Sequence, residues 1–94
     1  MKKEIAERYT RITRSLDRSK RDSQEPDAYP YLPGIIKTLE QMQQALQQRK
    51  ADLETCRRLV RGLGRLVTED YAFSESSLGQ ELLKIVDDFT FDKT

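Results

Sequence analysis

The chain has no histidine and no tryptophan, and it has one cysteine among its 94 residues. The absence of histidine removes the commonest general base and the commonest metal ligand. A single cysteine excludes a disulfide within the chain, which favours a reducing, cytoplasmic location. There is also no glycine-rich phosphate loop and no metal-site spacing, so we expect neither enzymatic activity nor a bound cofactor or metal.

Long apolar runs are absent as well. No stretch approaches the ~18 apolar residues of a membrane-spanning helix, and the N-terminus lacks the apolar core of a signal peptide. We therefore expect no membrane partner. The length of 94 residues predicts one domain over residues 1–94. Hydrophobic residues make up 36 % of the chain and charged residues 35 %, which predicts a narrow core.

The net charge of +1 provides no overall field that would select an acidic partner. The charge is nevertheless unevenly distributed. Residues 1–21 carry +5 and residues 34–67 carry +4, whereas residues 22–33 carry −3 and residues 68–94 carry −5.

The strongest pattern is an apolar seam that steps by four and three residues along the middle of the chain. The seam consists of Ile35, Leu39, Met42, Leu46, Leu53, Cys56, Val60, Leu63 and Val67. Its one missing position falls at Arg49. The pattern predicts a single long helix over about residues 34–68, with a coiled-coil-like seam. Gly62 and Gly64 are the candidate breakers, but the apolar phase continues through them.

Two shorter helices are predicted on either side, over about residues 2–21 and 77–90. Ile5, Tyr9, Ile12 and Leu16 give the first helix its apolar stripe, and Leu78, Leu82, Ile85 and Phe89 give the last helix a similar one. Between the first two helices, Pro26, Pro30 and Pro33 favour an ordered loop. We expect Tyr71 and Phe73 to pack at the corner before the last helix. The predicted fold is all-α with three helices.

The matching periods predict that both short helices pack antiparallel on the central helix, end to end along its two halves. Such a monomer would be only two helices thick and would leave apolar flanks wet. We therefore expect a homodimer with a four-helix cross-section. The candidate dimer and register residues are Ile36, Arg49, Leu53, Leu59, Leu66, Leu83 and Val86.

Arg49 has two interpretations. Its guanidinium could lock the helix register by bonding a carboxylate such as Glu4, or Asp52 of a second chain. Alternatively, its stem packs and its charged head reaches water.

Tyr29, Tyr31 and Leu32 are the candidate partner-binding residues, because tyrosines are frequent energetic centres of interfaces. The alternative is that they cover the end of a helix pair. Cys56 is either a reactive thiol or, because of its seam position, a small buried apolar residue.

Two sets of arginines could bind anions. Arg11, Arg14, Arg18 and Arg21 form a stripe on the first helix, which could contact phosphates or be a solvated face. Arg57, Arg58, Arg61 and Arg65 form a second patch, for which we expect neutralisation by acidic residues of the last helix, Arg57 opposite Asp88 and Arg65 near Glu81.

The sequence therefore predicts a non-enzymatic protein-interaction, adaptor or assembly protein that acts as a homodimer and binds a protein partner. The alternative is a small nucleic-acid-associated regulator that uses the basic face of the first helix.

Overall fold

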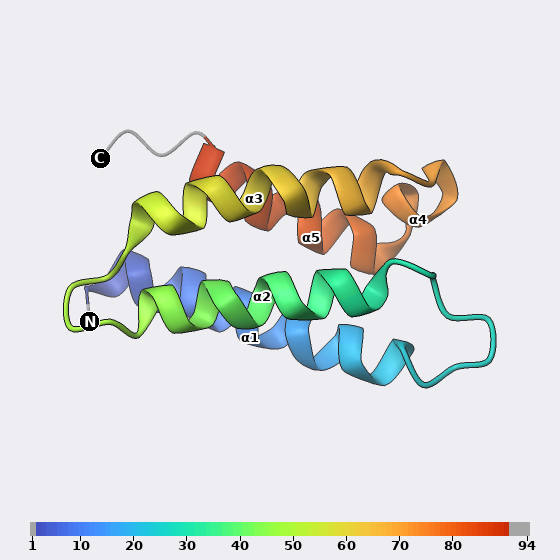
Figure 1. Ribbon diagram of the computed structural model, residues 1–94, viewed down its shortest axis with the longest axis horizontal. Helices are drawn as coiled ribbons and strands as arrows, with labels where there is room; N and C mark the ends of the chain where they lie inside the picture. Colours follow the sequence, from blue (N-terminus) through green and yellow to red (C-terminus); the bar gives the residue numbers. More distant parts are fainter. Residues whose placement is uncertain (1, 91–94) are drawn as a thin grey trace.

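The computed structural model describes residues 2–90, and there it consists of helices joined by short connections. The helices are α1 (Lys3–Asp22), α2 (Leu32–Leu46), α3 (Leu53–Thr68), α4 (Tyr71–Glu75) and α5 (Ser77–Thr90). The four long helices lie side by side and alternate in direction, and α4 lies at one end (Figure 1). The all-α prediction and the first and last predicted helices are confirmed.

The predicted long central helix is wrong, because the chain reverses between α2 and α3 at residues 47–52. We call these residues the turn end of the bundle. Residues 47–50 are all polar and exposed. Asp52 then starts α3 as its N-cap: its carboxylate accepts hydrogen bonds from the Thr55 backbone N–H (3.0 Å) and hydroxyl (2.6 Å). These bonds lower the pKa of Asp52, led by the hydroxyl bond.

Arg49 lies in this reversal and is exposed, so it occupies no seam position. Its predicted role as a register lock loses its basis, because there is no continuous helix for it to align. The two glycines, in contrast, do not break the chain: α3 runs through both Gly62 and Gly64. Continuity at the glycines is confirmed, and the break occurs where the apolar seam has its polar residue.

The predicted end-to-end placement of the first and last helices is also wrong. α1 and α5 pack side by side, and ion pairs join Arg11 to Asp88 and Arg18 to Glu81. As the residue number rises along α1, that of its partner on α5 falls, so the two helices are antiparallel. The register of α1 on α2 is close to the predicted one, with the Gln43 amide donating to the Thr13 hydroxyl (2.9 Å) and the Gln47 amide to the Tyr9 hydroxyl (2.6 Å).

One chain therefore closes a four-helix cross-section by itself, within overall extents of 39 × 22 × 18 Å. The physical reason for expecting a homodimer was a two-helix layer with wet flanks, and that reason no longer applies. The apolar residues expected at a dimer contact instead pack, partly buried, against the core of their own chain. They are Ile36, Leu53, Leu59, Leu66, Leu83 and Val86.

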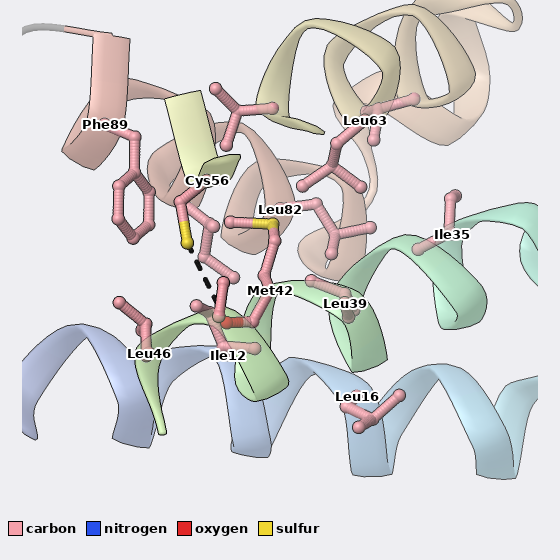
Figure 2. Close-up of a cluster of buried hydrophobic side chains, with 14 of the residues drawn as sticks. Ile12, Leu16, Ile35, Leu39, Met42, Leu46, Cys56, Leu63, Leu82 and Phe89 are labelled. Atoms are coloured by element: carbon pink, nitrogen blue, oxygen red, sulfur yellow. Dashed lines mark hydrogen bonds between the residues drawn. The ribbon is translucent and has the colours of Figure 1, made fainter. Parts of the chain in front are cut away.

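The core runs along the bundle axis and receives side chains from all four long helices (Figure 2). Cys56 belongs to this core and is fully buried, which confirms the interpretation as a buried residue. Its thiol donates a long hydrogen bond to the Met42 carbonyl (3.8 Å). Burial, followed by the charge of Asp52, raises the pKa of Cys56 to about 11, so the reactive thiolate is scarce at neutral pH.

No helix within residues 2–90 combines the length and the apolar character needed to cross a membrane.

Candidate functional site

The end of the bundle opposite residues 47–52 holds the other two connections of the chain (Figure 1). Residues 23–31 join α1 to α2, and residues 69–76, which include α4, join α3 to α5. We call these two segments together the aromatic end, because Tyr29, Tyr31, Tyr71 and Phe73 lie on them.

Tyr29 joins the two connections. Its ring stacks on Phe73 with the centroids 4.0 Å apart and the planes 9° from parallel. Tyr31 packs edge-on against the Tyr29 ring, with the two centroids 5.5 Å apart. The Tyr29 hydroxyl donates a 2.6 Å hydrogen bond to the Leu66 carbonyl near the end of α3. The loop after α1 is therefore fixed to both α3 and α4.

Local sequence explains why α4 forms at this place. Asp70 is its N-cap and accepts a 2.9 Å hydrogen bond from the Phe73 backbone N–H. The backbone of α4 also approaches α5 closely at Gly79, where an added Cβ would lie 2.0 Å from the Phe73 carbonyl oxygen. Only glycine permits this approach without a backbone shift.

The electrostatic environment of Tyr29 is negative. Its pKa is raised, first by burial and then by electrostatic interactions with Asp70, Tyr31 and Glu69. Each of these makes a phenolate less favourable. The phenol therefore remains a hydrogen-bond donor to Leu66 through the ordinary pH range.

The predicted partner-binding residues are divided by the structure. Leu32 is buried at 1 % exposure, and Tyr29 is partly buried in the aromatic stack, so both cover the end of the helices. Tyr31 is 45 % exposed and remains available to another molecule.

Sequence reasoning missed Tyr71, which is 79 % exposed although it was expected to pack at the corner. The corner position is taken by Phe73 alone. The missed signal was Asp70: a cap at this position starts α4 at Tyr71 and sets which of the two aromatic rings faces inward. No residue of α4 is buried, so the helix presents Tyr71 to solvent.

The arginine stripe of α1 is only partly free to bind an anion. Arg11 pairs with Asp88, and Arg18 pairs with Glu81 and also donates to the Ser77 hydroxyl (3.2 Å). Arg14 and Arg21 are exposed. Half of the predicted anion-binding set thus holds α1 against α5.

The acidic residues expected to neutralise the arginines of α3 take part in these pairs. Asp88 and Glu81, predicted to face Arg57 and Arg65, form the ion pairs described above with α1. Arg58, Arg61 and Arg65 are exposed, and the Arg58 guanidinium donates to the Thr55 hydroxyl at 3.2 Å.

Within residues 2–90, no three cysteine or acidic side chains gather closely enough to hold a metal ion. Comparison of the chain with protein-family models, with curated proteins and with solved structures gave no match in any of the three.

Proposed function

We propose that the chain is a non-enzymatic interaction module that binds a protein partner through the aromatic end. The observation that supports this is the exposure of Tyr31 and Tyr71. These are the large hydrophobic side chains that residues 2–90 leave exposed, and both lie at this end. Tyrosine contributes a large contact area at low entropic cost, which explains its frequency at the energetic centres of interfaces.

Each of the two connections carries one exposed ring and one partly buried ring. Phe73 and Tyr29 are stacked against each other, and this stack gives the loops a fixed shape. Tyr31 extends that stack at its edge, and Tyr71 lies on the helix that carries Phe73. A rigid support under exposed rings lowers the cost of ordering on binding.

The experiment is site-specific photocrosslinking with p-benzoylphenylalanine in place of Tyr71, in an extract of the source organism. The same amino acid in place of Lys84, which is exposed on α5, is the matched control. We expect a distinct protein adduct from position 71 only. Excess wild-type chain should suppress the adduct, whereas a Tyr31→Ser/Tyr71→Ser chain should not. Identical adducts from both positions, or equal competition by the variant, would contradict the proposal.

A homodimer is not needed for this role, since one chain completes its own cross-section. The dimer predicted from the sequence is therefore a separate question with a separate test, and we propose a monomer in its place. Sedimentation equilibrium at micromolar concentration measures the mass directly. We expect a monomer, and a stable dimeric mass would restore the assembly role.

The second candidate function is nucleic-acid binding, which the exposure of Arg58, Arg61 and Arg65 on α3 favours. Phosphate binding by such a face would weaken steeply with salt. Replacing the three α3 arginines with glutamine should then abolish binding to a nucleic-acid probe, whereas Arg14→Gln/Arg21→Gln tests the face on α1. No binding of wild type at low salt would exclude this function.

A further inference from the structure

The aromatic end carries a second feature besides its exposed rings, which is the sign of its charge. The charged side chains of the two connections are all acidic and exposed. They are Glu25, Asp27, Glu69, Asp70 and Glu75. The last turn of α1, which precedes the first connection, carries the exposed basic residues Lys20 and Arg21. Residues 22–36 and 66–83 contain no lysine or arginine.

These acidic side chains are not used in the ion pairs that join the helices. The ion pairs formed within residues 2–90 involve other carboxylates, namely Asp88, Glu81 and Glu40. Among the five acidic residues, Asp70 has a structural task as the cap of α4. The acidic side chains thus lie on the same two connections as the exposed rings and leave their charges to solvent.

Exposed tyrosine rings within a negative field suit one class of occupant. We propose that the partner is recognised through a basic segment, whose lysine or arginine side chains lie over the rings of Tyr31 and Tyr71 and pair with the surrounding carboxylates. A cation is attracted by the face of an aromatic ring, and complementary charge selects the partner and speeds its approach. This inference rests on the proposed function and adds the chemistry of the partner.

A second copy of the chain is the competing occupant, because the turn end is basic. Arg49 and Lys50 are exposed there, and Lys2 lines the same hollow as these two residues. A contact between the turn end of one chain and the aromatic end of another would be head-to-tail and would grow into longer assemblies. Sedimentation velocity at increasing protein concentration distinguishes this case: growing species in the absence of any peptide would overturn the proposal.

The main experiment measures binding of fluorescent peptides of equal length to the full chain by anisotropy. One peptide carries lysine and arginine, a second has glutamine in their place, and a third has glutamate. We expect only the basic peptide to bind, and its affinity should fall as salt screens the charges beyond a Debye length of about 8 Å at physiological ionic strength. Equal binding of the basic and glutamine peptides would overturn the proposal, as would no binding of the basic peptide.

Variants locate the binding. Tyr31→Ser/Tyr71→Ser and Glu25→Gln/Asp27→Asn/Glu75→Gln should each weaken binding by about tenfold. All of these side chains are exposed, so the fold should persist. The matched control, Glu4→Gln/Glu54→Gln/Asp87→Asn, changes exposed carboxylates elsewhere and should retain binding. Equal losses in the two carboxylate sets would show unspecific charge attraction and overturn the proposal.

Crosslinking separates this inference from the proposed function. If position 71 captures one protein through a segment without basic residues, the charge inference fails and the interaction module stands. If position 71 gives no adduct, or gives only adducts that the double tyrosine variant also suppresses, both the charge inference and the interaction module fail.

Discussion

The two ends of the bundle reverse the chain by different means. At the turn end, a short polar run is followed by the Asp52 cap, and residues 47–50 are all exposed. At the aromatic end, two connections are held together by a ring stack, a hydrogen bond to Leu66 and a close backbone approach at Gly79. The first end needs only to let the helices turn. The second end has far more structure than reversal requires, which is consistent with a surface built to present Tyr31 and Tyr71.

The largest effect should come from Gly79→Ala, because an added methyl group meets the Phe73 carbonyl. The backbone of α4 must move, and we expect a loss of about 3 kcal/mol in the free energy of unfolding. Gly62→Ala is the matched control, because a Cβ at Gly62 has no neighbour within 4 Å. That substitution in α3 should stabilise by up to about 1 kcal/mol. Urea denaturation measures both, and an equal change in the two variants would contradict the account.

Phe73→Ala tests the ring stack directly. Removing a ring that is partly buried against Tyr29 should cost about 2 kcal/mol, less than for a fully buried phenylalanine. Tyr71→Ala, two positions earlier in the same helix, should change stability by less than about 0.5 kcal/mol. Thermal unfolding followed by circular dichroism distinguishes the pair. A costly Tyr71→Ala would mean that Tyr71 serves the fold and is not kept exposed for a partner.

The contrast between the ends also explains which elements the sequence could predict. Apolar spacing located α1 and α5 within one residue, because an amphipathic helix repeats its stripe faithfully. It could not detect the turn end, because Leu46 and Leu53 are separated by one heptad. The seam keeps its phase across the reversal, and a polar residue at Arg49 is compatible with both a helix and a turn. The distinguishing signal was Asp52 followed by Thr55.

The candidate site was predicted in the same partial way. Tyr31 was located by its proline-rich, aromatic context, and the same context wrongly suggested that Leu32 is accessible. Tyr71 was missed since a five-residue helix is too short for its apolar stripe to be recognised. The ion pairs of α1 with α5 were missed because they depend on the fold-back at the turn end, which brings the two helices together.

A smaller effect is expected from Tyr29→Phe, which removes only the hydroxyl that donates to Leu66. The loss should be about 1 kcal/mol. The folded-state pKa of Tyr29 lies above its ordinary value of 10.0, so its contribution to stability is present below pH 10 and is lost as the pH rises through the folded-state pKa. Phenylalanine does not titrate, and the variant should show less alkaline destabilisation. Denaturation at neutral and alkaline pH measures this difference, and identical pH profiles would contradict it.

The smallest expected effect lies at the turn end. Asp52→Ala removes a cap at an exposed site and should lower the melting temperature slightly, whereas Asp52→Asn should retain most of the cap. The folded-state pKa of Asp52 is below its ordinary value of 3.8, so its contribution is present above that pH and is lost as the pH falls through the folded-state pKa. A difference between wild type and Asp52→Ala that does not shrink in acid would contradict this role for the carboxylate.

The fold-back at the turn end supports every other conclusion, and one distance measures it. Spin labels are attached at Lys37 on α2 and Arg65 on α3, both exposed, in a Cys56→Ala background diluted with unlabelled protein. Pulsed electron resonance should give a distance comparable to the 22 Å width of the bundle. A continuous helix would place the two positions about 42 Å apart at 1.5 Å per residue. A distance near that value would contradict the four-helix fold of the chain and restore the long central helix.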